Sequence, residues 1–323
     1  MSNPRDLDVD IASWDGVQFR VRKSLLSEAS PVFNDLFSVS QPNPGLDAPT
    51  DVVKLSEPSK TIRLLFLSLP ESPPSHLVDS LSDLADLLQA ADKYDMKTIL
   101  DHAISFLDKP KFLFHEPLRV YALASRYGAH HTAQLAARRT IQYPLLHAEY
   151  ISDLEIVDGW TIYRVLRYHK QCMTAALELA TDHTWIRDGY VFFDCPGASY
   201  GEDDDEDEAK KALTTTIRTH PSRKHKNGYL KEVSVHSWWT KFMDSTKVAL
   251  SESICSETIR DRERVIEALS SASQCSRCGR RVRSDFSKFL DMFVYEVEAR
   301  VKQVSCILWF IKCRSLDLYF WIL

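Results

Sequence analysis

This chain contains little glycine and has no excess of positive charge. Nine Gly among 323 residues leave little material for the glycine-rich loops that cradle phosphate groups, and neither a nucleotide-binding fingerprint nor a kinase motif set is present. The formal net charge is −5, whereas proteins that bind nucleic acid draw affinity from Lys and Arg placed against phosphates. We therefore expect neither phosphate chemistry nor a nucleic-acid partner.

Signals for secretion and membrane insertion are missing as well. The first ten residues, MSNPRDLDVD, are polar and contain no apolar core of a signal peptide. The tail over 306–323 is apolar, but Lys312, Arg314 and Asp317 interrupt it, and a membrane helix needs about 20 mostly apolar residues. We expect an intracellular protein, cytoplasmic or nuclear, with no membrane partner.

A disulfide framework is also absent, because the seven Cys are odd in number and widely spread, as in a reducing compartment. Cys275 and Cys278 have the CxxC spacing that forms half of a tetrahedral zinc site, but no second close pair is obvious. With the basic neighbours Arg277, Arg280 and Arg281, the two thiols could instead be a redox pair. The simplest interpretation is a turn between helices, so we assign no metal ligand and no cofactor.

Two alternating patterns open the chain and predict a β-hairpin. Over 7–11 and again over 17–22, apolar residues alternate with polar ones, so each strand has one apolar face. Between them, Asp15 and Gly16 are a strong signal for a tight turn, because Gly tolerates a positive backbone φ angle.

A helix start follows the hairpin. In the dipeptide Ser30-Pro31, the Ser oxygen can cap free amides and Pro fits the first helical position. The sequence predicts that this helix carries four apolar side chains to a core: Val32, Phe33, Leu36 and Phe37.

Two runs in this region carry a family resemblance. The run DGVQFRVRKSLLSEASPVFNDLF, 15–37, resembles the opening of a BTB/POZ domain, and LLQAADKYDM, 87–96, resembles its fourth-helix signature. Arg22 is a departure, because the family usually has His there. The resemblance covers about the first third of the chain, and the helices up to about Ala180 resemble the extension in BTB proteins of the fungal (basidiomycete) type.

Amphipathic helices dominate the rest of the chain, and this predicts the α+β class, mostly helical, with a small sheet flanked by helices. The acidic run EDDDEDE, 202–208, cannot pack, because like charges repel and no apolar side chain is there to bury. An apolar stripe over 286–304 predicts a helix that packs within the chain. The predicted divisions are a BTB/POZ domain (6–110), an all-α helical extension (115–195), a disordered acidic and basic linker (196–232), a partly disordered C-terminal helical region (233–305) and an apolar tail (306–323).

One literal catalytic motif is present. The run GASYG, 197–201, fits the GxSxG nucleophile elbow, which requires a buried parallel strand that feeds a strained turn into a helix. Here Pro196 precedes the motif, an acidic run follows it, and no series of alternating strands and helices lies upstream. We therefore predict a loop, no catalytic residue and no enzyme, and a serine hydrolase that uses Ser199 stays an alternative.

Two further groups of basic residues are candidate sites. The run RKHK, 223–226, could be a nuclear localisation signal or a nucleic-acid patch, but the acidic run close by favours a linker. Together with the CxxC pair as a zinc knuckle, it defines the second alternative, a nuclear or transcriptional regulator. His130 and His131 lack carboxylates at ligand spacing, so we predict solvated surface there.

The family resemblance implies a non-enzymatic protein-interaction module. BTB domains self-associate through helices near their N-terminus, so we expect a homodimer with an adaptor or scaffold role that binds other proteins. Some members recruit a cullin scaffold through a hydrophobic-x-Glu motif, but the matching run here, Val39-Ser40-Gln41, ends in Gln. Because Gln cannot supply the charge for a charge-assisted hydrogen bond, a cullin is the weaker partner hypothesis.

Overall fold

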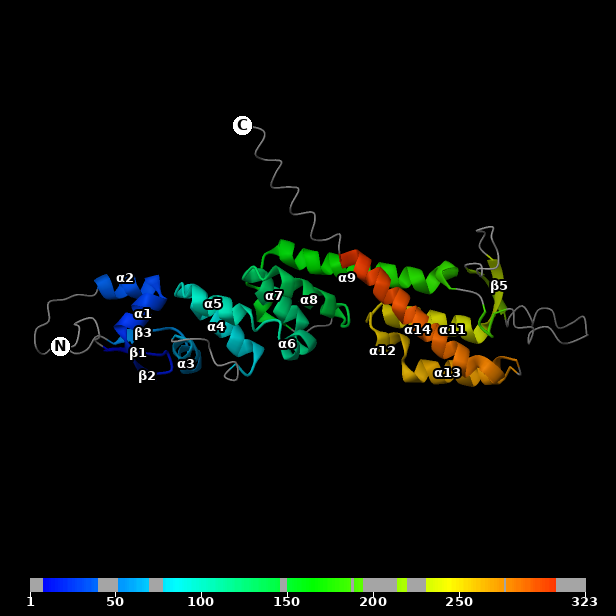
Figure 1. Ribbon diagram of the computed structural model, residues 1–323, viewed down its shortest axis with the longest axis horizontal. Coiled ribbons are helices and arrows are strands. Elements are labelled where there is room, and N and C mark those ends of the chain that lie inside the picture. Colours follow the sequence, from blue (N-terminus) through cyan, green and yellow to red (C-terminus); the bar gives the residue numbers. More distant parts are fainter. Residues whose placement is uncertain are drawn as a thin grey trace, which may run out of the picture. The chain divides into compact units, whose positions relative to one another are not determined.

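The computed structural model describes residues 8–39, 52–69, 78–145, 150–186, 189–193, 214–219, 231–275 and 277–305 (Figure 1). The chain forms two compact units, the first comprising 1–137 with 151–157 and the second comprising 138–150 with 158–323. A small sheet near the N-terminus and many helices confirm the predicted α+β, mostly helical class. Helices of the predicted extension, 115–195, belong to both units, and the division into domains stays a prediction.

A three-stranded sheet opens the first unit. The central strand β1 (Asp8–Ala12) pairs antiparallel with β2 (Gln18–Arg22) and parallel with β3 (Val53–Lys54). Val9 and Ile11 are buried, as the alternating pattern predicts.

The turn between β1 and β2 is a three-residue loop. The backbone N–H of Ser13 donates to the Val17 carbonyl oxygen at 2.9 Å, and the Gly16 N–H donates to the Ser13 carbonyl oxygen at 3.0 Å. Gly16 has a φ angle of 83°, which confirms the predicted role of this Gly and is typical of three-residue hairpin loops. The carboxylate of Asp15 accepts hydrogen bonds from the N–H and the hydroxyl of Ser59, at 3.0 and 2.7 Å. Asp15 thus joins the hairpin to the start of the helix α3, whose first residue is Ser59.

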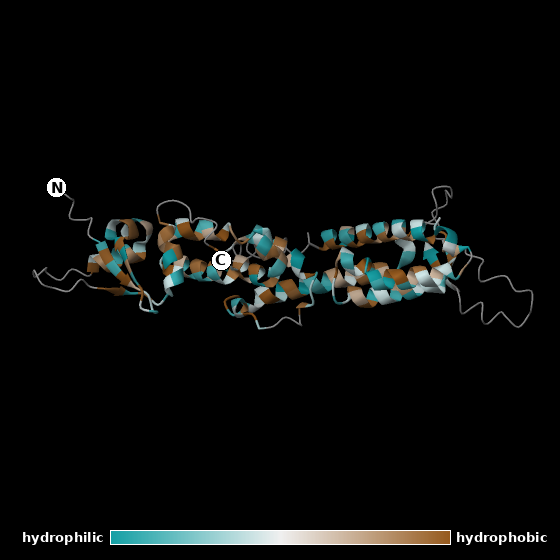
Figure 2. Ribbon diagram, turned by 90° about the horizontal axis from the view of Figure 1, so that it is seen from below, coloured by the Kyte–Doolittle hydropathy of each residue, from teal (hydrophilic) through white to brown (hydrophobic). Residues whose placement is uncertain are grey.

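Helices make up most of the first unit, and hydrophobic and hydrophilic residues alternate along them (Figure 2). The N-terminus of α4 has a capping box, in which Ser80 and Asp83 each bond the other's backbone N–H. The helices are α1 (Lys23–Ala29), α2 (Pro31–Val39), α3 (Ser59–Leu67), α4 (Leu81–Lys93), α5 (Lys97–Ile104), α6 (Pro110–His115), α7 (Pro117–Arg126), α8 (His130–Thr140), which spans the boundary between the units, and the 3-10 helix η2 (Ser152–Leu154).

The second unit is built around long helices and aromatic side chains. The α9 and α14 helices pack against each other, and α11 packs against both α9 and α13. The ring centroids of Trp239 and Phe289 lie 5.7 Å apart, and both residues are fully buried together with Phe192. Phe286, Phe289, Phe293 and Val297 of α14 are all buried, which confirms the predicted packing of this stripe within the chain. The helices are α9 (Gly159–Thr181), α11 (Ser237–Leu250), α12 (Ser256–Ile259), α13 (Arg262–Ser273), α14 (Cys278–Ser305) and the 3-10 helix η3 (His183–Trp185).

A second, two-stranded sheet corrects the predicted linker. β4 (Thr214–Thr219) pairs antiparallel with β5 (Lys231–His236). The prediction of a disordered linker over 196–232 is therefore wrong for 214–219, and the region 233–305 is not purely helical. Ile217, Val233 and Val235 are buried, so the strands have an apolar face, and β-branched residues favour the extended backbone. In the sequence, the charged runs on either side make this short alternation of apolar and polar residues look like part of a linker.

Within the described ranges, no helix is long and apolar enough to cross a bilayer.

Candidate protein-interaction surface

Three apolar side chains of α2 point away from the core of the first unit. Val32 and Leu36 are 42% and 39% exposed, and Val39 is 86% exposed. Their spacing of i, i+4 and i+7 places them on one side of the helix. We call Val32, Leu36 and Val39 the α2 stripe. An apolar surface of another protein can bury side chains with this spacing on a helix.

The opposite side of α2 is held firmly in the unit. Phe33 is buried, and its ring stacks on Tyr94 with centroids 4.8 Å apart and on Phe37 with centroids 6.0 Å apart. The Lys23 ammonium of α1 lies 5.6 Å from the Phe37 ring centroid, in cation–π geometry. The inner face is therefore fixed while the α2 stripe stays exposed.

This arrangement corrects one prediction. Phe33 and, in part, Phe37 are buried as predicted, but Val32 and Leu36 are exposed. Apolar residues occur on two sides of α2, and only one side can pack on Tyr94. Exposed apolar residues on a helix are thus the feature that sequence reasoning missed, although their spacing is visible in the sequence.

A cluster of polar side chains joins Glu57 to the end of α4. One carboxylate oxygen of Glu57 accepts from the Lys93 ammonium at 2.6 Å, and the other accepts from the Tyr94 hydroxyl at 2.5 Å. Burial by itself would raise the pKa of Glu57, but the hydrogen bonds from Lys93 and Tyr94 lower it below its usual value. Burial and the neighbouring Glu57 charge raise the pKa of Tyr94, so its hydroxyl stays a donor.

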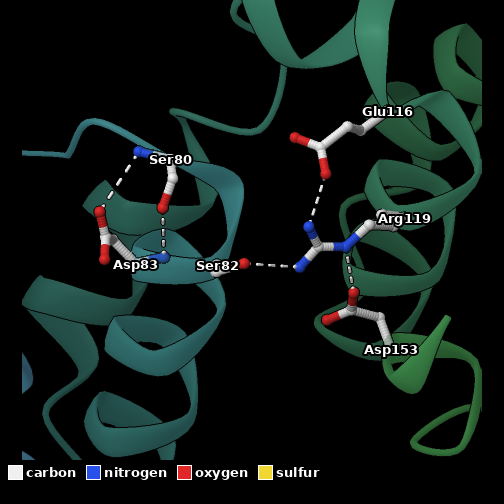
Figure 3. Close-up of polar contacts among 6 residues, drawn as sticks. All are labelled: Ser80, Ser82, Asp83, Glu116, Arg119 and Asp153. Atoms are coloured by element: carbon white, nitrogen blue, oxygen red, sulfur yellow. Dashed lines mark hydrogen bonds and ion pairs between the residues drawn. The ribbon is translucent and has the colours of Figure 1, made fainter.

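A second polar centre joins α4, α7 and η2, with the Arg119 guanidinium in the middle (Figure 3). Its nitrogens donate to a carboxylate oxygen of Asp153 at 2.5 Å, to one of Glu116 at 2.5 Å, and to the Ser82 hydroxyl at 3.2 Å. Burial alone would lower the pKa of Arg119, but the bonds to the two carboxylates raise it. The residues of η2, at the far end of the first unit's sequence, are thereby fixed to its helices.

The CxxC pair lies at the turn between α13 and α14. The N–H of Cys278 donates to the Cys275 sulfur at 3.5 Å, and the two thiols are not joined by a disulfide. Nowhere in the described part of the chain do three or more His, Cys, Asp or Glu side chains form a group that could hold a metal ion. His130 and His131 lie at the start of α8 and are exposed, which confirms the predicted solvated surface.

Several predicted features fall outside the described residues. These are the GASYG run with Ser199, the acidic run 202–208, the basic run 223–226, Gln41 and the apolar tail.

Comparison with known proteins identifies the first third of the chain. Residues 1–111 match the model of the BTB/POZ domain family. No curated protein matches the chain significantly. The family match confirms the resemblance carried by 15–37 and 87–96, and it makes this part of the chain a protein-interaction domain without catalytic function of its own. The resemblance to basidiomycete proteins stays a prediction.

Proposed function

We propose that this chain is a non-enzymatic adaptor that dimerises through the α2 stripe of its BTB/POZ domain and binds a further protein. The observation that carries the proposal is the exposure of Val32, Leu36 and Val39 on a helix whose other face is buried. A match to the BTB/POZ family supports it, because such domains mediate self-association and binding to other proteins. The proposed location is inside the cell.

A symmetric contact fits the stripe. In a twofold dimer the same patch of both copies meets itself, so an apolar helix face can pack against its own image. Stable interfaces bury about 1,200 Å² or more in total, which exceeds what three side chains supply. The α1 helix packs against α2 and carries the half-buried Leu25, so it extends the surface available to a second copy.

Light scattering on the full chain at tens of micromolar tests dimerisation. We expect the unaltered protein to have the mass of a dimer, and the double variant Val32→Glu with Leu36→Glu to have the mass of a monomer, because buried unpaired carboxylates oppose association. Leu67→Glu is the matched control, since Leu67 of α3 is also exposed, at 47%, but lies outside the α2 stripe.

A monomeric unaltered protein, or equal dissociation of the Leu67→Glu control, would count against the stripe as the interface. Circular dichroism spectra of all variants must coincide for the comparison to hold. The adaptor role is tested separately, by affinity capture with the full chain and with a chain that lacks residues 1–111. We expect at least one protein to be captured by the full chain alone.

A further inference from the structure

Two cysteines lie at the start of α14, the longest described helix of the second unit. Cys278 is the first residue of α14 and is fully buried, whereas Cys275 is partly exposed. The Cys278 N–H donates to the Cys275 sulfur at 3.5 Å, and the Gly279 N–H donates to the Cys275 carbonyl oxygen at 2.9 Å. The sulfur of Cys275 therefore lies beside the backbone of Cys278.

A backbone hydrogen bond favours a disulfide between the two cysteines. The Gly279 N–H donates to the Cys275 carbonyl oxygen four residues earlier, which is the hydrogen bond of an α-helical turn. In such a turn the α-carbons of residues three apart are separated by about 5 Å, within the range of about 4.4–6.8 Å that disulfides span. Side chains three residues apart also share a helix face.

The surroundings favour attack by Cys275 on an anionic oxidant. Backbone N–H groups and the positive end of the α14 dipole stabilise negative charge on a sulfur at this position. Arg277, Arg280 and Arg281 are exposed around the turn and supply positive charge to the surface. The Cys278 thiol is buried, so we expect it to react with the Cys275 sulfur once that sulfur has formed a mixed disulfide.

We propose that Cys275 and Cys278 are a reversible dithiol–disulfide pair that exchanges with a small anionic disulfide such as glutathione disulfide. The Cys275 thiolate attacks one oxidant sulfur, so the S–S bond of the oxidant breaks, a mixed disulfide forms on Cys275, and the first glutathione leaves and takes up the proton that Cys275 released. The Cys278 sulfur then attacks the Cys275 sulfur, and the second glutathione leaves with the proton of Cys278. The pair loses two electrons, which reduce the oxidant to two thiols.

Other cysteines of the same unit provide internal controls. Burial raises the pKa of the Cys172 thiol in α9 to about 11, so this thiol reacts slowly. Cys255 is partly exposed, with the Thr258 hydroxyl 3.1 Å from its sulfur, but no Cys lies three residues away from it in the sequence. Cys255 can therefore take up a glutathione but has no neighbouring thiol in its turn to release it.

Trypsin offers a direct readout, because it cleaves after Arg277, between the two cysteines. The full chain is incubated with glutathione disulfide, its remaining thiols are alkylated, and the tryptic peptides are measured by mass spectrometry. We expect peptides 265–277 and 278–280 to appear as one joined species that separates on reduction. Its share should rise with the ratio of oxidised to reduced glutathione.

Single substitutions test the order of the two steps. In Cys278→Ser or Cys278→Ala the glutathione adduct should persist on Cys275, whereas in Cys275→Ser modification of Cys278 should be more than ~10-fold slower because this thiol is buried. Three results would overturn the proposal: a glutathione adduct that persists on Cys275 of the unaltered protein, equal reactivity of both thiols, or one zinc ion per purified chain that either Ser variant loses. The result does not depend on dimerisation through the α2 stripe.

Discussion

The hydroxyl of Ser30 donates a hydrogen bond to the carbonyl oxygen of Tyr94 at 2.5 Å, although 64 positions separate the two residues. The same hydroxyl oxygen accepts the N–H of Phe33 at 3.1 Å, so one buried side chain both starts α2 and ties it to the end of α4. Phe33 stacks on the ring of Tyr94 next to this bond. The helix that presents the α2 stripe is thus held at its first turn.

Removing the Ser30 hydroxyl should weaken this attachment. Ser30→Ala deletes a helix cap and leaves the buried Tyr94 carbonyl without this donor, so we expect a loss of about 1–3 kcal/mol in the free energy of unfolding. Urea denaturation measures the loss, and hydrogen exchange of α2 amides locates it. Ser38→Ala is the control, because the Ser38 hydroxyl bonds only locally to the Asn34 carbonyl on the exposed side of the same helix. An equal loss in both variants would contradict the role of Ser30.

The Glu57 cluster should make the first unit sensitive to acid. The pKa of Glu57 is lower in the folded chain than its usual value of 4.5, so its contribution is complete above that value and is lost as pH falls through the folded-state pKa. We expect Glu57→Gln to unfold at lower urea than the unaltered protein at neutral pH, with the difference shrinking below about pH 4. Urea midpoints measured across this range provide the test. Glu28→Gln, at an exposed position of α1, makes the same substitution outside this cluster and is the control.

Arg119 should resist replacement by Lys. An ammonium cannot reproduce the fork that reaches Asp153, Glu116 and Ser82 together, so Arg119→Lys should cost about 1–3 kcal/mol and Arg119→Ala at least as much. Faster hydrogen exchange in η2 and at the start of α7 is the expected signature. Arg126→Lys is the comparison, because the half-exposed guanidinium of Arg126 forms only a long ion pair, with 3.9 Å between its Nη2 and the Asp92 Oδ2. We expect this substitution to cost less. Unchanged hydrogen exchange in the Arg119→Lys variant would show that one positive charge is enough to hold η2 and that the guanidinium fork is not needed.

A buried carboxylate organises the second unit in a comparable way. Asp285 of α14 is 4% exposed and accepts the backbone N–H of Val191 at 3.0 Å. Asp285→Ala should leave that amide without this acceptor and cost about 1–3 kcal/mol, whereas Asp285→Asn keeps an acceptor and should cost less. Thermal unfolding shows which of the two variants is the less stable. Hydrogen exchange of the Val191 amide shows whether the loss arises at this contact. Asp291→Ala is the control, because it removes an exposed carboxylate of the same helix that pairs only with the surface guanidinium of Arg260.

Local patterns predicted the parts of the fold that neighbouring residues decide. The hairpin follows from alternation and from Gly16, the start of α2 follows from Ser30 and Pro31, and the aromatic stripe of α14 follows from helical spacing. The β4 and β5 strands were missed, because six-residue alternations between charged runs resemble a linker. The two segments form a sheet because Ile217 and Val233 pair across the strands, and that pairing is not apparent from either segment alone.

The sequence by itself determined the helical periods, the turn glycine and the helix cap, since each depends on residues a few positions apart. Two of its runs also carried the resemblance to the BTB/POZ family whose model matches residues 1–111. Tertiary structure alone decided which side of α2 is buried, which carbonyl Ser30 reaches and which carboxylates surround Arg119. The physical reason is that a helix with apolar residues on two sides can bury either one. The choice is made by the shape and hydrogen-bonding needs of a partner such as Tyr94, many residues away along the chain.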